Sequence, residues 1–198
     1  FKMKAQMKFQ KIICLVMLIV GALCFVSAVG LCTTIYDLLY VFCDRVDGAN
    51  IFYDIQPFNN QFMIYALIMI LAAVALYVTM THKRRRYYVA NIVCSIVVAV
   101  VDVVLSALIF VGLLKYKAQF LAVDFETLKK WIEEIYKNIK YTESTFYFDV
   151  AMVMCALVVA ASILLIVNLV WKLKIMKKED KLLGGKYNPD GARMEVVK

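Results

Sequence analysis

The stretch "VVAVVDVVLSALIF", residues 97–110, decides the fold of this chain because it is a long run of branched apolar residues. Runs of this kind make up four blocks, which cover residues 12–35, 62–80, 89–114 and 146–171. Each block has about the 20 residues that a helix needs to cross about 30 Å of hydrocarbon. In lipid, only a helix satisfies its backbone hydrogen bonds within a single segment. The sequence therefore predicts an all-α integral membrane protein, a bundle of four transmembrane helices.

The composition agrees with this class. Hydrophobic residues make up 64% of the 198 residues, whereas soluble domains have about 45–50%. The first block follows several lysines, as a signal peptide does, but it is longer than the 7–15 apolar residues typical of one. We expect it to be a true span. The chain then divides into a membrane domain, residues 1–176, and a polar tail, residues 177–198.

The distribution of basic residues predicts the orientation of the bundle. The N-terminal segment, the link between the second and third blocks and the segment from Lys172 onward together hold 16 of the 23 Lys and Arg residues. The link contributes a basic cluster of Lys83, Arg84, Arg85 and Arg86. Because basic segments remain in the cytoplasm, we expect an up-down-up-down bundle with both termini cytoplasmic. The positive charge then faces anionic lipid headgroups, and nucleic-acid binding is not expected. The chain lacks glycosylation sequons, which favours a bacterial plasma membrane.

The segment between the third and fourth blocks predicts an amphipathic helix over residues 121–140, on the extracytoplasmic side. Its apolar residues recur at spacings of four and three, which places them on one stripe of a helix. The stripe consists of Leu121, Phe125, Leu128, Ile132, Ile135 and Ile139, and Trp131 flanks it. Such a stripe must be buried against the bilayer surface, against another part of the chain or against a partner subunit. The sequence leaves these three alternatives open.

Asp102 is the one charged residue in the middle of a predicted span. A helical projection places it on a polar or small face of the third block, with Asn91, Ser95, Ala99 and Ser106. A charge at that depth costs at least about 2.5–3.5 kcal/mol. No Lys or Arg falls inside any predicted span, so we expect a neutral carboxyl that donates a hydrogen bond. Candidate acceptors are Ser27, Tyr65, Ser106 and Ser162.

Two functions for Asp102 remain open. A neutral carboxyl can join helices or dock a partner span by a hydrogen bond. An intramembrane carboxyl can also couple transport to a proton or cation. The chain lacks the internal repeat and the broken helices that many transporters have.

The sequence offers no catalytic or metal-binding pattern. His82 is the only histidine and lies in the basic link, which argues against haem between spans, an intramembrane zinc site and a Ser–His dyad. The six cysteines form no C-x-x-C pair, and a disulfide between Cys32 and Cys43 has no support beyond their expected location on one side. We therefore expect no enzyme activity, no cofactor and no metal.

These patterns favour a non-catalytic integral membrane subunit that binds and stabilises a larger membrane assembly, such as a transporter. The alternative is a small proton- or cation-coupled transporter or channel that acts as a homo-oligomer through Asp102. The expected partners are the lipid bilayer and either other membrane subunits or further copies of the chain. A subunit should co-purify with other proteins, whereas a transporter should move its solute without them.

Overall fold

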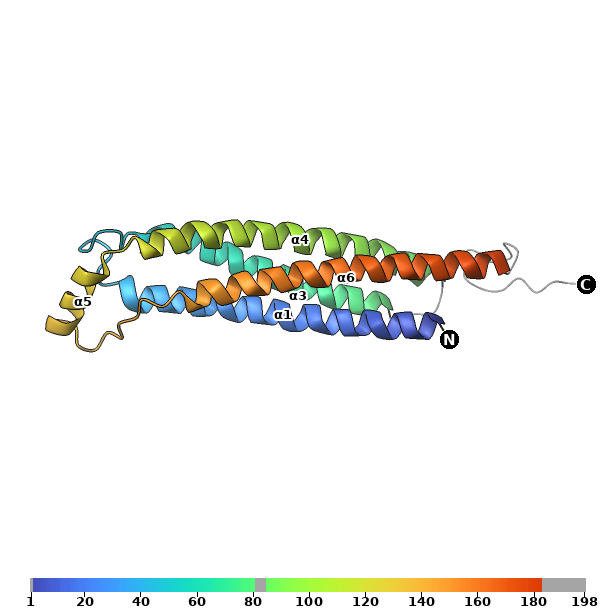
Figure 1. The fold of residues 1–198 in the computed structure, drawn as a ribbon, viewed down its shortest axis with the longest axis horizontal. Helices are drawn as coiled ribbons and strands as arrows, with labels where there is room; N and C mark the ends of the chain where they lie inside the picture. The colour runs from blue at the N-terminus through green and yellow to red at the C-terminus, as the bar shows by residue number, and fades with distance from the viewer. Residues whose placement is uncertain (1, 81–84, 183–198) are drawn as a thin grey trace, which may run out of the picture. The chain divides into compact units, whose positions relative to one another are not determined.

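The computed structural model describes residues 2–80 and 85–182, and within these ranges all regular structure is helical (Figure 1). The helices are α1 (Lys2–Leu39), α2 (Ile51–Asp54), α3 (Gln56–Met80), α4 (Arg85–Leu121), α5 (Phe125–Glu134) and α6 (Phe146–Leu182). Four of them, α1, α3, α4 and α6, are long and apolar enough to cross a membrane. The prediction of an all-helical fold with four helices long and apolar enough to span a membrane is confirmed for these ranges.

The long helices extend beyond the apolar blocks that predicted them. Helix α1 starts in the lysine-rich segment at Lys2, α4 continues to Leu121 and α6 continues to Leu182. Lys, Gln and Leu are good helix formers, so the helix does not stop where the hydrophobicity stops. Residues 177–182 of the predicted tail therefore belong to α6. Residues 183–198 lie outside the described ranges.

The basic link is described only in part. Lys83 and Arg84 lie outside the described residues. Arg85 and Arg86 begin α4, but the described structure does not include their side chains.

The chain forms two compact units. Unit 1 comprises residues 1–20, 68–104 and 158–198, and unit 2 comprises residues 21–67 and 105–157. A segment of each long helix belongs to each unit, and unit 2 also contains α2 and α5.

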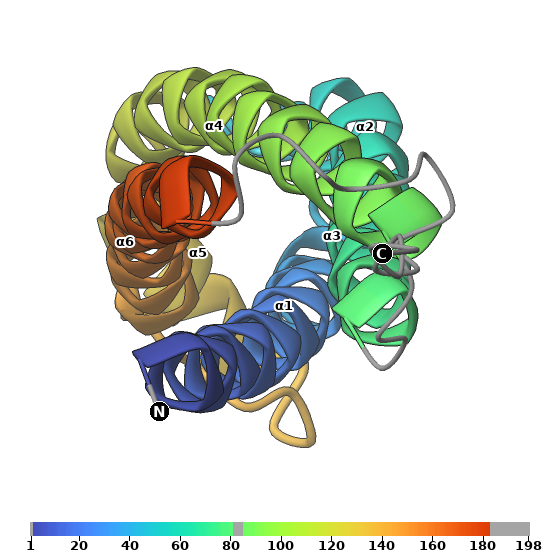
Figure 2. The ribbon, with the colours of Figure 1, turned by 90° about the vertical axis from the view of Figure 1, so that its right-hand side faces the viewer.

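The interior of unit 1 is built from small and branched residues of all four long helices. Its core consists of Ile13, Cys14, Met17, Ala73, Leu76, Val98, Ala99, Ala161 and Leu165. Figure 2 looks onto the helix ends of this unit, with α1 beside α3 and α4 beside α6. Large apolar residues such as Leu15, Val100 and Ile163 are exposed on the outside of the unit. A surface of this kind suits lipid, which offers apolar side chains the environment that a protein core would.

Unit 2 is held together by contacts between the segment that follows α1 and the segment around α5. The backbone N–H of Asp124 donates to the carbonyl oxygen of Asp47 over 3.0 Å. Gly48 follows with a φ of 81°, and a Cβ there would lie 3.0 Å from the Cα of Val123. Because only glycine adopts such a φ at little cost, this residue allows the two segments to meet closely.

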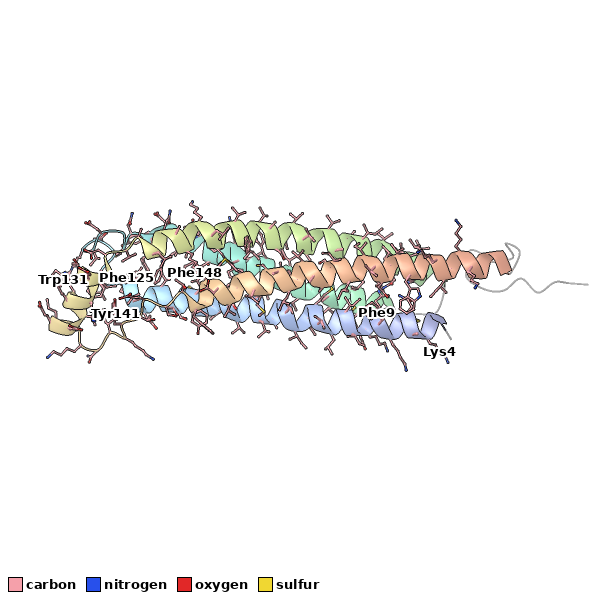
Figure 3. The ribbon with its side chains drawn as sticks, in the orientation of Figure 1. Lys4, Phe9, Phe125, Trp131, Tyr141 and Phe148 are labelled. Carbon is pink, nitrogen blue, oxygen red and sulfur yellow. The ribbon has the colours of Figure 1, made fainter. Side chains whose placement is uncertain are left out.

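Aromatic rings and one ion pair connect further elements of unit 2. Phe120 at the end of α4 contacts both Phe125 of α5 and Phe148 of α6, with ring centroids 5.2 and 5.7 Å apart (Figure 3). Lys117 Nζ lies 2.5 Å from Asp149 Oδ1 and so joins α4 to α6. The start of α5 is fixed by Asp124, whose carboxylate accepts a hydrogen bond from the Thr127 backbone N–H, as expected for an N-cap residue.

Helix α5 is shorter than the predicted helix over residues 121–140. Leu121 is the last residue of α4, and a turn at 122–123 separates it from α5. The helix ends at Glu134, and the chain then runs to the segment that follows α1. There the ring of Tyr136 packs edge-on against Phe42, with centroids 5.3 Å apart. The six apolar residues at helical spacing therefore do not form one continuous stripe.

Candidate functional site

A cluster of polar side chains occupies the interior of unit 1, and we call it the amide–lysine cluster. Its members are Gln6 and Gln10 of α1, Thr79 of α3, Asn91 of α4, and Asn168 and Lys172 of α6. All of them except Thr79 are buried, and Lys172 is only 3% exposed. Each long helix thus contributes at least one polar group to the same interior region.

The helical spacing explains how two helices each contribute two groups. Gln6 and Gln10 are four residues apart on α1, as are Asn168 and Lys172 on α6, and residues at this spacing share one face of a helix. Gln6 Nε2 donates to Gln10 Oε1 over 3.2 Å and to Asn168 Oδ1 over 3.1 Å. The first bond aligns the two side chains of α1, and the second connects α1 to α6.

Asn91 is the centre of the cluster because its amide meets three other helices. Its Oδ1 accepts from Gln10 Nε2 over 2.9 Å and from Lys172 Nζ over 2.6 Å. Its Nδ2 donates to Thr79 Oγ1 over 3.0 Å. A buried polar group is costly unless it is hydrogen-bonded, and Asn91 satisfies several such groups at once. Gln6 Oε1 is buried with no hydrogen-bond partner in the described structure.

Lys172 is the residue of the cluster that the sequence interpretation missed. The fourth apolar block was ended at Trp171, so Lys172 was assigned to the cytoplasmic end of the chain. The helix α6 continues past Lys172 and buries it, so the interior of unit 1 contains a lysine that the end of the apolar block at Trp171 does not predict. The available signal was the pair Asn168 and Lys172, which share a helix face as Gln6 and Gln10 do.

The predicted polar face of α4 lies in the interior. Asn91, Ser95, Ala99, Asp102 and Ser106 are all buried. Asn91 belongs to the amide–lysine cluster, and Ser95 Oγ donates to the backbone carbonyl oxygen of Asn91 over 2.7 Å.

Asp102 is buried in unit 1, but the expected hydrogen bond is not present at Oδ1. This atom has no hydrogen-bond partner among the described residues, and neither has Ser106 Oγ in unit 2. Two of the expected acceptors bond within their own helices instead: Ser27 Oγ donates to Leu23 O over 2.8 Å, and Ser162 Oγ donates to Val158 O over 2.9 Å. Hydroxyls in helices often bond to the carbonyl four residues earlier. This bond uses the single O–H donor of each serine and leaves the lone pairs of its oxygen able to accept.

The predicted docking residues around α5 fall into two groups. Leu128 and Ile132 are buried within unit 2, whereas Leu121 and Ile135 are exposed. Phe125, Trp131 and Ile139 are partly buried, and Figure 3 labels Phe125 and Trp131 at α5. The buried pair packs against the chain itself, so only the remaining residues are accessible to a partner.

The structure gives no disulfide between Cys32 and Cys43. Among the residues that the structure describes, no group of three or more His, Cys, Asp or Glu side chains could hold a metal ion. The amide–lysine cluster itself contains a single titratable group, Lys172. Its chemistry is that of hydrogen bonding between helices.

Comparisons with family models, with curated proteins and with solved structures gave no match.

Proposed function

We propose that the chain is a non-catalytic integral membrane subunit that binds and stabilises a larger membrane assembly, such as a transporter. The observation that carries this proposal is the amide–lysine cluster. Its polar groups bond to one another across four helices, while large apolar side chains such as Leu15, Val100 and Ile163 are exposed on the outside of unit 1. Polar side chains used in this way hold helices together, and what the unit offers outward is an apolar surface for lipid or for other helices.

We propose further that the chain lies in the plasma membrane, that its long helices alternate in direction and that both termini are cytoplasmic. The charge of the two units supports this orientation. The sequence ranges of unit 1 hold 16 Lys and Arg against 5 Asp and Glu, whereas those of unit 2 hold 7 against 10. The positive-inside rule then assigns the helix ends of unit 1 to the cytoplasm.

In this orientation α5 is an amphipathic helix outside the membrane. Leu128 and Ile132 are buried on one side, and Lys129, Lys130 and Glu133 are exposed on the other. A helix with one apolar and one charged face suits the boundary between protein and water.

We place the partner on a groove between α4 and α6 in unit 1. The groove encloses about 400 Å³ and is lined by Ala99, Val100, Val103, Val104, Ser162, Ile163, Ile166 and Val167. Small residues such as Ala99 and Ser162 allow a second transmembrane helix to approach closely. The lining is otherwise made of branched apolar residues, so the partner helix should present an apolar face.

The test is mass spectrometry of the tagged chain, gently extracted from its native membrane. A stoichiometric partner supports the proposal, and its absence overturns it. The variant Val103→Trp fills the groove, and Val93→Trp places the same side chain at an exposed position of α4 that does not line the groove. We expect the first variant to lose the partner and the second to retain it.

A second candidate function is favoured by the buried Asp102 Oδ1 without a hydrogen-bond partner. A carboxyl in this state could bind and release a proton or cation in a homo-oligomeric transporter. Flux by the purified chain in liposomes, abolished by Asp102→Asn, would support this function. The subunit proposal instead requires no flux from the chain alone, and stable assembly of the Asn variant.

A further inference from the structure

A row of lysines on α1 continues directly into a row of leucines. Lys4, Lys8 and Lys11 are spaced by four and three residues, and Leu15 and Leu18 continue the same spacing. These five residues therefore lie along one face of the helix. The three lysines are exposed, and within the described structure none has an ion-pair partner. Figure 3 labels Lys4 at the start of this row.

A groove lies beside this row, between α1 and α3 in unit 1. It encloses about 310 Å³ and is lined by Lys11, Leu15 and Leu18 of α1, by Ala73, Val74 and Tyr77 of α3, and by the buried Cys14. This volume accommodates about ten groups the size of a water molecule, at roughly 30 Å³ each. The groove therefore has room for part of a hydrocarbon chain.

The polar groups of the groove lie toward one end of it. Lys11 precedes Leu15 and Leu18 along α1, and Tyr77 follows Ala73 and Val74 along α3. Figures 1 and 2 show the start of α1 beside the end of α3, so Lys11 and Tyr77 flank the same end. The groove thus has an ammonium and a phenol at one end and apolar walls beyond them.

We propose that this groove binds one anionic phospholipid of the surrounding membrane. Its phosphate lies at Lys11 and Tyr77, with Lys8 next along the row, and one acyl chain follows Leu15, Leu18 and Val74. The groove matches this occupant in charge and polarity: the lysines have no ion-pair partner within the described structure, and the apolar walls begin one helical turn beyond Lys11. A lysine near the membrane surface increases the affinity for anionic lipid about fivefold, and its aliphatic stem packs on the apolar wall.

This site is independent of the partner groove, because it lies on α1 and α3 rather than on α4 and α6. If the proposal is correct, this groove binds an anionic lipid in preference to a lipid without net charge, beyond the general attraction of a basic protein to anionic membranes. Lysines elsewhere on the same unit should contribute much less to the binding of the first lipid.

The experiment is a lipid titration of the delipidated full chain in detergent, followed by native mass spectrometry. The probes are phosphatidylglycerol and phosphatidylcholine with identical acyl chains. We expect the first phosphatidylglycerol to bind at least fivefold more tightly than phosphatidylcholine. Lys11→Gln should remove most of this preference, whereas Lys174→Gln, at an exposed lysine of α6, should leave it unchanged.

The variant Val74→Trp tests the apolar part of the groove. It should weaken the first binding event for both lipids, because the acyl chain loses its place. Equal affinity for the two lipids in the original chain would overturn the proposal, as would equal effects of Lys11→Gln and Lys174→Gln. Both lysines are exposed, so a thermal unfolding measurement of each variant should match the original chain and confirm that folding is intact.

Discussion

Replacement of Asn91 by Leu tests whether the amide–lysine cluster holds the four helices of unit 1 together. The two side chains have the same branching and the same number of non-hydrogen atoms, so the change removes hydrogen bonds without opening a cavity. It removes two bonds to neutral partners, Gln10 and Thr79, and one to the charged Lys172. Hydrogen bonds between helices in a membrane average about 0.6 kcal/mol and reach about 1.7. We therefore expect the free energy of unfolding to fall by about 3 kcal/mol.

The assay is reversible unfolding of the purified chain in mixed micelles, with the free energy taken from the transition. Ser95→Ala is the matched control, because Ser95 is also buried on this face of α4 but bonds only to its own helix. The control should change the free energy of unfolding by less than about 1 kcal/mol.

A double-mutant cycle makes the test specific for the central bond. Lys172→Met keeps a long side chain but removes the ammonium group. If Asn91 and Lys172 interact as the structure shows, the two substitutions should be non-additive by about 1–2 kcal/mol. Additive effects, or an Asn91→Leu variant as stable as the Ser95→Ala control, would refute the reasoning.

Three further predictions concern unit 2. In Gly112→Ala the new Cβ would overlap with Phe58 Cε2, and since Phe58 is buried the variant should lose about 1–3 kcal/mol of unfolding free energy. Phe58→Leu should restore part of this loss, and an unchanged stability of Gly112→Ala would contradict this packing. Hydrogen bonds from Thr127 hold the pKa of Asp124 below its usual range. Amide protection of α5, measured by hydrogen exchange, should therefore be complete above about pH 5, where the carboxyl is ionised even in the unfolded chain. It should fall as the pH drops through the lower pKa of the folded chain, and Asp124→Asn should abolish this pH dependence. Lys117→Met should lower the free energy of unfolding by only about 0.2–1 kcal/mol in the same assay, because the ion pair of Lys117 with Asp149 is partly exposed. A larger loss would show that the pair is more shielded from solvent than its exposure indicates.

The four long helices could be predicted from the sequence because their cause is local. Apolar runs of sufficient length must form helices in lipid, whatever their neighbours are. The burial of the polar face of α4 follows from spacing alone in the same way. The ends of the helices could not be predicted, because hydrophobicity stops at the lipid boundary whereas helix propensity does not. That difference explains why the burial of Lys172 was not predicted, since the apolar block ends one residue before it.

The partners within the site were not predictable by the same means. The projection placed Asn91 and Asp102 on one face, but the bonds of Asn91 depend on which residues of α1, α3 and α6 lie at the same level. Similarly, the spacing of Leu121, Ile135 and Ile139 matched a helix, yet the cap at Asp124 and the contact of Tyr136 with Phe42 end the helix on either side. Contacts between elements therefore determine the hydrogen-bond partners of Asn91 and the ends of α5, which the local sequence pattern does not specify.

The short segment after α5 has a practical consequence for imaging a chain of 198 residues. Tyr136 is anchored by Phe42 and by a 3.0 Å hydrogen bond from Arg45 Nη1, whereas Lys137 and Asn138 directly beyond it are exposed. A rigid soluble protein inserted between these two residues would be attached next to a fixed point and would leave the helices unaltered. Such a fusion would provide the mass and shape that single-particle cryo-electron microscopy needs for particle alignment.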